Sequence, residues 1–145
     1  MKLGLVLIFS LIAIAVVSIL LFVYTPSPMV RVNNVSILVT IADEPNEQIA
    51  GLSGWQKLED DHGMLFIFPD VQKRLFWMRD MKFPIDIVWI QNNRVTGVTK
   101  NVLPPHDDIV PEAWSPTPVT TVLEVPAYYT NQHGIATDTA LTVTQ

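Results

Sequence analysis

The chain has 145 residues, 49% of them hydrophobic, with 9 Lys and Arg against 14 Asp and Glu and a net charge of -5. Such an acidic body repels phosphate backbones, so we do not expect nucleic acid as a partner. There is no Cys, which excludes disulfides, thiolate metal sites and a Cys nucleophile. The length allows a membrane segment and one small domain, because domains commonly have about 100 to 150 residues.

The N-terminal segment 3–24 carries no charge, and its polar residues before Tyr24 are Ser10 and Ser18. At about 1.5 Å per residue, a helix of this length reaches about 33 Å, enough to cross a hydrocarbon layer of about 30 Å. The segment therefore predicts a transmembrane anchor over residues 1–24. The alternatives are a cleaved signal peptide, whose apolar region usually has about 7 to 15 residues, and a buried helix of a soluble protein.

Positive charge near this segment is sparse. Lys2 and the amino terminus precede it, and Arg31 follows it. The positive-inside rule then favours a single-pass protein in the cell membrane, with its N-terminus inside and its domain outside. We interpret residues 25–32 as a short linker, because its prolines stop a helix and favour extended backbone. Residues 33–145 are expected to form the domain.

The rest of the chain shows short apolar runs separated by polar corners. Alternating apolar residues predict a strand over 30–42, and Asp43-Glu44-Pro45 predicts the start of a short helix that ends near Leu52. Gln91-Asn92-Asn93 predicts a tight hairpin, because Asn tolerates positive φ angles. Further strands are expected over 64–68, 75–78, 85–90, 94–103, 119–125 and 139–144, with a helical turn over 127–133.

These elements predict a mainly β fold: a small antiparallel barrel or sandwich with one or two short helices, preceded by an N-terminal transmembrane helix. Pro69-Asp70 is expected to stop the strand over 64–68. Residues 104–118 contain five prolines among polar residues and are expected to form a long irregular loop. Long structured loops in small domains are often functional.

Five blocks follow one another along the domain: Gly51-Leu52, Gly63-Met64-Leu65-Phe66 with Phe68, Phe76-Trp77-Met78-Arg79, Pro84-Ile85-Asp86-Ile87, and Val122-Leu123-Glu124-Val125-Pro126-Ala127 with Gly134-Ile135. Together these blocks resemble the domain of unknown function family 192 (DUF 192). The resemblance covers nearly all of the chain from about residue 33. It implies a compact, mainly β domain, often exported or membrane-tethered in prokaryotes, and no established reaction, substrate or cofactor.

Two of the blocks depart from the family pattern. Ala50-Gly51-Leu52-Ser53 stands where the family usually has Arg-Gly-Leu-Met, and Arg79-Asp80-Met81 replaces the usual Lys-Asn-Thr. A charge that the family's Arg brought to a shared site would be missing from this chain.

Asp86 interrupts an apolar, strand-like run between Ile85 and Ile87. An isolated carboxylate in apolar surroundings is very costly, so we expect it to be paired or hydrogen-bonded. Arg79, or backbone donors near Pro84, would be its partners. Three interpretations stay open: Asp86 ties down the turn, it belongs to a binding or reaction site, or it is exposed.

Trp77 and Met78 are adjacent, so on a strand they point to opposite faces and one of them is expected in the core. The other, with Trp55 or Trp114, would floor an open pocket. Aromatic faces beside Arg and Asp commonly hold a sugar or a peptide. Plain packing is the alternative interpretation.

Two loops carry candidate metal ligands, His106-Asp107-Asp108 and Asp60-Asp61-His62. Neither has the spacing of a known zinc or calcium motif. We interpret both as solvated loops and expect no metal and no cofactor. Gly51-Leu52-Ser53-Gly54 lacks the pattern of a nucleophile elbow, so a Ser nucleophile is not expected either.

The sequence thus favours a membrane-anchored extracytoplasmic binding module of the cell envelope. Its partners would be the membrane, through the N-terminal helix, and an envelope protein, peptide or glycan. The alternative is an envelope hydrolase that uses Asp86 or Asp80 as general base or metal ligand, and a third interpretation is a structural subunit that docks onto another membrane protein. The proposed site, roofed by the loop 104–118, comprises Trp77, Arg79, Asp80, Asp86 and Trp114.

Overall fold

The computed structural model describes residues 27–144. The predicted transmembrane anchor over 1–24 lies outside these residues. Within the described range, no helix is both long enough and apolar enough to span a membrane.

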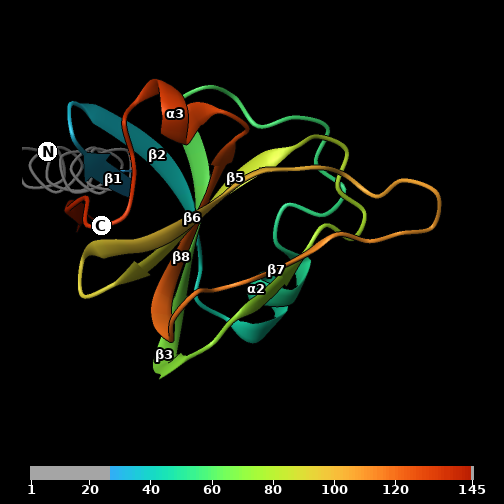
Figure 1. Ribbon diagram of the computed structural model, residues 1–145, viewed down its shortest axis with the longest axis horizontal. Coiled ribbons are helices and arrows are strands. Elements are labelled where there is room, and N and C mark those ends of the chain that lie inside the picture. Colours follow the sequence, from blue (N-terminus) through green and yellow to red (C-terminus); the bar gives the residue numbers. More distant parts are fainter. Residues whose placement is uncertain (1–26, 145) are drawn as a thin grey trace, which may run out of the picture.

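Most of the described strands form one curled sheet (Figure 1), in the order β6-β5-β8-β3-β2-β1-β9. Its neighbours are antiparallel except for β2 and β3, which are parallel. The remaining two strands, β4 and β7, form a separate antiparallel ribbon. The strands are β1 (Met29–Val32), β2 (Val35–Ala42), β3 (His62–Gln72), β4 (Leu75–Trp77), β5 (Ile85–Gln91), β6 (Arg94–Val102), β7 (Glu112–Trp114), β8 (Val119–Pro126) and β9 (Leu141–Thr144).

The sheet curls until its two edges meet at one end. Arg94, at the start of β6, forms a bridge with Ala140, just before β9. The Val95 N–H donates to the Thr139 carbonyl at 2.9 Å, and the Leu141 N–H donates to the Asn93 carbonyl at 3.0 Å. The sheet is therefore a half-barrel with one closed rim, which confirms the mainly β prediction and favours the barrel over the sandwich.

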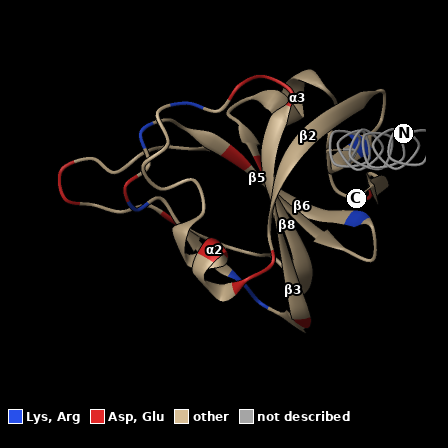
Figure 2. Cartoon of the chain, turned by 180° about the vertical axis from the view of Figure 1, so that it is seen from behind, with Lys and Arg blue, Asp and Glu red and all other residues tan. Residues whose placement is uncertain are grey.

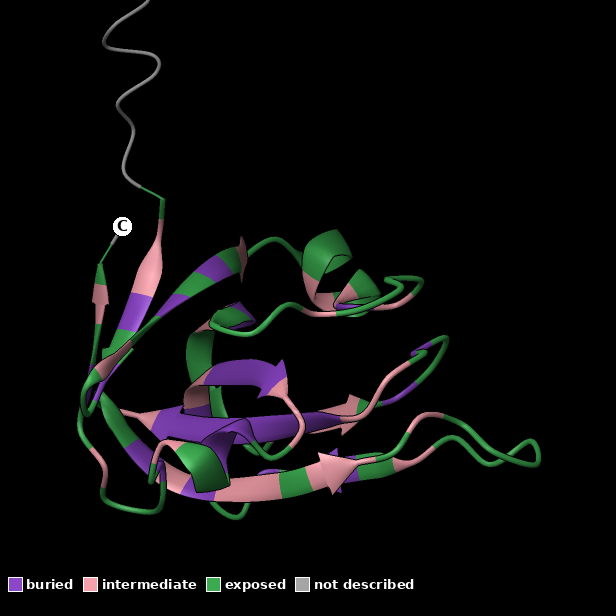
Figure 3. Cartoon of the chain, turned by 90° about the horizontal axis from the view of Figure 1, so that it is seen from above, coloured by how far each residue is buried: buried purple, intermediate pink, exposed green. Residues whose placement is uncertain are grey.

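Each face of the sheet carries its own hydrophobic core, which leaves the central strands buried on both sides (Figure 3). Val88, Leu123 and Val125 belong to the core inside the half-barrel. The second core includes Phe66 and Trp89 and lies on the opposite face. It is covered by the β4–β7 ribbon and by the segments that carry Leu52, Met78 and Met81.

Both predicted helices are present. Helix α2 (Pro45–Ala50) begins with Pro as expected, and the Glu47 carboxylate accepts from the backbone N–H of Glu44 at 3.3 Å. Helix α3 (Tyr129–Gln132) is followed by Gly134 at φ 64°. The predicted hairpin between β5 and β6 is confirmed, because Asn92 and Asn93 adopt φ angles of 51° and 58°.

The single strand predicted over 30–42 is wrong. Asn33 adopts φ 50° and turns the chain, so that β1 and β2 form an antiparallel pair. Asn tolerates this backbone region well, which makes it a natural turn residue. The sequence pattern did not indicate this turn, because apolar residues alternate along the chain both before and after it.

Two further expectations are corrected. Strand β3 continues through Pro69, and its register against β8 shifts between Ile67 and Gln72. Pro lacks the N–H that a regular ladder needs and is tolerated at such an irregularity. The predicted irregular loop over 104–118 contains β7, which pairs with β4 and leaves only the tip of the loop projecting from the molecule (Figure 1).

Gly63 allows β3 and β8 to approach closely, because a Cβ there would lie 2.7 Å from the Glu124 carbonyl oxygen. We expect Gly63→Ala to lower the free energy of unfolding by about 1 to 3 kcal/mol, because the backbone must shift to admit the methyl group. Urea unfolding followed by circular dichroism would measure this. Ser36→Ala, at an exposed position of β2, is the control. Equal stability of the two variants would contradict the close approach.

Candidate functional site

A cavity of about 380 Å³ lies between α2, the turn that follows it, β3 and the β4–β7 ribbon. Its walls are mainly apolar and aromatic. Three of the lining side chains are strongly exposed and mark its mouth: Ile49 at 63%, Trp77 at 36% and Trp114 at 59%. The deeper lining includes Leu52, Phe66, Phe68, Phe76 and Met81.

One acid, Glu124 of β8, lies at the buried end of this cavity. Side chains alternate along a strand, so Glu124 points away from the inner core that Leu123 and Val125 occupy. It is only 5% exposed, and its Oε2 atom has no hydrogen-bond partner among the described residues. Burial raises the pKa of Glu124 from 4.5 to about 8, because an apolar environment disfavours the charged form.

The nearest basic residues of the cavity do not neutralise Glu124. Arg74 lines the cavity, but its guanidinium pairs with Asp70 and lies 4.0 Å above the centre of the Phe68 ring. The hydrogen bond from Arg74 holds the pKa of the Asp70 carboxyl below its ordinary value. Lys73 also lines the cavity. Among the described residues, no cationic side chain forms an ion pair with Glu124.

Two of the residues proposed from the sequence, Trp77 and Trp114, line the mouth, and Arg79 lies beside Trp77 without lining the cavity. Trp77 and Trp114 come from the two strands of the ribbon, and the Arg79 guanidinium lies 5.2 Å from the centre of the Trp77 ring. Met78 is the core member of the Trp-Met pair, at 1% exposure. Trp55, the other aromatic residue considered from the sequence, is exposed and is not part of the lining.

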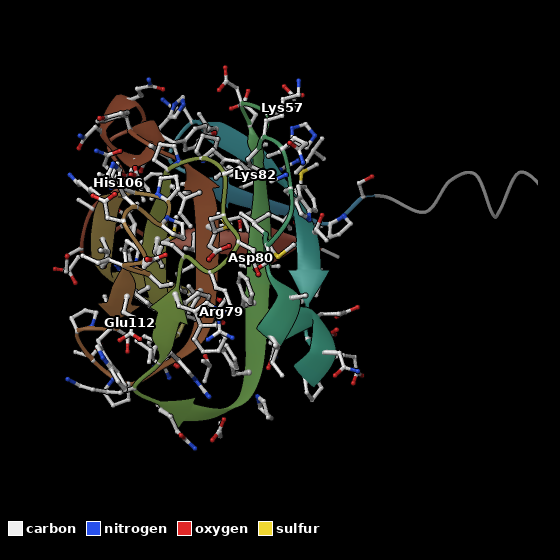
Figure 4. All side chains as sticks on the ribbon, turned by 90° about the vertical axis from the view of Figure 1, so that its right-hand side faces the viewer. Lys57, Arg79, Asp80, Lys82, His106 and Glu112 are labelled. Atoms are coloured by element: carbon white, nitrogen blue, oxygen red, sulfur yellow. The ribbon has the colours of Figure 1, made fainter. Side chains whose placement is uncertain are left out.

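Asp80 contributes its backbone to the cover of the cavity. It is an exposed residue at φ 57° in the turn after β4 (Figure 4). Its carbonyl accepts from the Gly54 N–H at 3.0 Å, and the neighbouring Arg79 carbonyl accepts from the Ser53 hydroxyl at 2.8 Å. These two bonds fasten the turn after α2 to the turn after β4.

Asp86 lies apart from the cavity and is fully buried. Its carboxylate accepts four hydrogen bonds: from the backbone N–H of Asn101 at 2.8 Å, of Tyr128 at 3.2 Å and of Thr130 at 3.0 Å, and from the Thr130 hydroxyl at 2.6 Å. The carboxylate thereby holds the start of α3 against the end of β6. Arg79, the partner considered from the sequence, is not among these donors.

The two acidic loops are exposed. His106 Nδ1 lies 2.7 Å from the Asp107 carboxylate in the projecting tip, and His62 Nδ1 lies 3.1 Å from the Asp60 carbonyl. Residues 27–144 contain no group of three or more His, Asp or Glu that could hold a metal ion.

A family model matches residues 29–143, and its description is DUF192, uncharacterized ACR. The chain belongs to the DUF192 family. This confirms the resemblance seen in the sequence. No curated protein matches this DUF192 chain significantly.

Two solved structures share the fold. One, from Sinorhizobium meliloti 1021, is described as a candidate transcription regulator: it is 24% identical, has a TM-score of 0.73, and the match covers 82% of this chain and 97% of that one. The other, from Novosphingobium aromaticivorans DSM 12444, is described as a protein of unknown function: it is 24% identical, has a TM-score of 0.72, and the match covers 79% of this chain and 83% of that one. At this identity the likeness shows the fold alone.

Sequence reasoning missed Glu124 as a site residue, although it noted the block that contains it. The pattern was the same as at Asp86: one acid within an apolar strand. An alternation count along 119–125 places Glu124 on the same face as Val122, which lies in the second core. That count would have predicted a second buried carboxylate.

We expect Asp86→Asn to lower the free energy of unfolding by about 3 kcal/mol, because the amide nitrogen of Asn would face N–H donors and would leave some of them unpaired. Thr130→Val removes the hydroxyl but keeps the three backbone donors, so it should cost only about 1 kcal/mol. Denaturant unfolding of both variants measures the difference. An Asn variant as stable as the parent would contradict a structural role for this carboxylate.

The raised pKa of Glu124 should make stability fall with pH. The folded protein holds this proton more tightly than the unfolded chain, so the free energy of unfolding declines from about pH 4.5 to about pH 8 and then levels off. Glu124→Gln should remove this decline. The variant should be more stable than the parent by roughly 3 to 5 kcal/mol at about pH 9, and nearly equal to it at about pH 4. Parallel curves for the two proteins, measured by denaturant unfolding, would contradict the burial of an unpaired carboxyl.

Proposed function

We propose that this DUF192 domain is a binding module that takes a small, mostly apolar ligand into the cavity beside α2. The observation that carries the proposal is the Glu124 carboxyl at the buried end of a mainly apolar cavity, with an Oε2 atom that has no hydrogen-bond partner among the described residues. Ligand sites commonly have volumes of about 300 to 1,000 Å³ and combine an apolar lining with a few placed polar groups. A cavity of about 380 Å³ lies within that range.

The exposed apolar side chains at the mouth support the same function. Ile49, Trp77 and Trp114 are large, and all are substantially exposed around one opening. Trp and Tyr are enriched at binding surfaces because an aromatic ring offers a large contact area at low entropic cost. The two Trp residues of the site inferred from the sequence therefore keep their proposed role, with Arg79 beside them.

The module would act at the membrane. The uncharged segment 3–24 is long enough for a single-pass anchor. The predicted linker 25–32 is too long, because Met29–Val32 form β1 of the sheet; residues 25–28 would hold the domain close to the lipid surface. The weak excess of positive charge before the segment favours a domain outside the cell membrane. Its ligand would then be a small, mostly apolar component of the cell envelope, such as the end of a peptide.

Binding is better supported than hydrolysis by Asp86 or Asp80. The carboxylate of Asp86 is engaged by four donors and lies away from the cavity. Asp80 does not line the cavity. A general base must reach its substrate's proton within hydrogen-bond distance, and neither acid faces the space where a ligand would sit.

The charges of this domain do not favour a nucleic-acid partner. The net charge of -5 disfavours contact with a phosphate backbone. Figure 2 shows acidic positions on α2 and on several loops, with the basic positions scattered between them. A nucleic-acid surface would gather Lys and Arg on one face.

A blocked cavity tests the proposal. The full chain in phosphatidylcholine nanodiscs would be screened by saturation-transfer NMR against neutral, cationic and anionic aromatic fragments, with empty nanodiscs as background. Ala50 lines the cavity at an exposed position, so Ala50→Trp should weaken binding about tenfold or more by filling the mouth. Asn46→Trp, on the same helix but outside the lining, should bind like the parent. If no fragment binds, or if both variants bind equally, the proposal is wrong.

A further inference from the structure

We propose that the cavity selects small apolar molecules that carry a protonated amine, and that Glu124 binds the ammonium group. This inference rests on the proposed binding function and names the class of ligand. Three observations support this inference: the missing hydrogen-bond partner of Glu124, the aromatic side chains in the cavity wall, and the hydrogen bonds and charge that only an amine would bring.

The first reason is that the Oε2 atom of Glu124 has no hydrogen-bond partner among residues 27–144. Its neighbours across the strands are Met64 on β3 and Ile87 on β5, both apolar. The charged residues that share the cavity lining are Lys73 and Arg74, at the corner between β3 and β4. Arg74 binds Asp70 through its Nη2 group and lies over Phe68, while its buried Nε has no partner; neither base is paired with Glu124 within the described residues.

The second reason is the aromatic wall. Phe66 and Phe76 meet edge to face with ring centres 4.8 Å apart, and Trp77 and Trp114 extend this surface to the mouth. The faces of aromatic rings attract cations and also bury apolar surface. A ligand with an apolar body and a cationic head would therefore be complementary to the whole depth of the cavity.

The third reason distinguishes an amine from its neutral and anionic analogues. An ammonium group donates up to three hydrogen bonds and also neutralises the carboxylate. A neutral alcohol can hydrogen-bond but leaves the buried charge uncompensated. An anionic ligand could approach Lys73 at the rim, but its body would then leave Glu124 unpaired in a drier cavity.

Occupancy should therefore depend on ionised Glu124. Burial raises the pKa of this carboxyl to about 8, so the empty cavity holds it mostly protonated near neutral pH. An alkyl ammonium keeps its own proton to about pH 10. The affinity for an amine should rise as pH increases toward about 8, whereas a ligand that only accepts a hydrogen bond from the protonated carboxyl would show the opposite trend.

Calorimetry on the full chain in phosphatidylcholine nanodiscs would test this with three compounds of similar shape: 2-phenylethylamine, 2-phenylethanol and 3-phenylpropionate. At about pH 8.5 we expect the amine to bind about tenfold more tightly than either analogue. Between about pH 6 and pH 8.5 its affinity for the parent protein should rise about tenfold or more. Glu124→Gln, which should fold because it removes an uncompensated charge, should bind amine and alcohol within about twofold of each other.

The outcomes separate the two proposals. If the alcohol or the propionate binds as tightly as the amine, or if Glu124→Gln keeps the preference, the amine inference is wrong while the binding function stands. A flat pH dependence of amine affinity in the parent overturns the inference without relying on any variant. If none of the three compounds binds the parent, or if Ala50→Trp binds them unchanged, the inference fails together with the proposed function.

Discussion

The structure depends on central strands that are buried on both faces. Every residue of β5 from Ile85 to Ile90 is buried, and β8 places Leu123 in one core and Val122 in the other. A curled sheet can enclose only the core on its concave side. The second core therefore requires a cover made of other elements, and the ribbon, α2 and the turns after them supply it. The candidate site lies beneath this cover.

The cover is held by a small number of polar contacts, because its segments are too short to form a layer of their own. Arg74 and Ser115 exchange two bonds, from the Ser115 N–H to the Arg74 carbonyl and from the Arg74 N–H to the Ser115 hydroxyl, each at 2.9 Å. The Met78 N–H donates to the Pro111 carbonyl at 3.0 Å. Near α2 the cover includes three small residues, Ala50, Gly51 and Ser53, and these do not fill the space above β8. The cavity therefore forms because the segments that cover the second core leave space above β8.

The sequence predicted the elements whose causes are local. Asn92-Asn93 specifies its hairpin and Pro45 marks a helix start, because backbone preferences act over a few residues. The sequence did not predict that β7 pairs with β4, since Trp114 and Leu75 are distant in the chain and their pairing is decided by the core beneath them. It grouped Trp77, Arg79, Trp114 and Asp86 in one proposed site. In the structure Trp77 and Trp114 line the cavity and Arg79 lies beside Trp77, whereas Asp86 lies apart from them. When both faces of a strand are buried, the hydropathy pattern does not distinguish the face that contacts backbone N–H donors from the face that lines a cavity.

Asp86 and Glu124 show why the surroundings decide the role of a buried acid. Each lies in a central strand between apolar residues, and each is almost fully inaccessible. Asp86 is near the start of β5, where the chain enters the sheet and free backbone N–H groups from α3 and from Asn101 can turn toward it. Glu124 is flanked by β3 and β5 in regular ladders, whose N–H groups are already committed to the sheet. The fold can complete the first carboxylate from its own backbone. The described residues do not complete the second in this way, and the Oε2 atom of Glu124 keeps no hydrogen-bond partner beside the cavity.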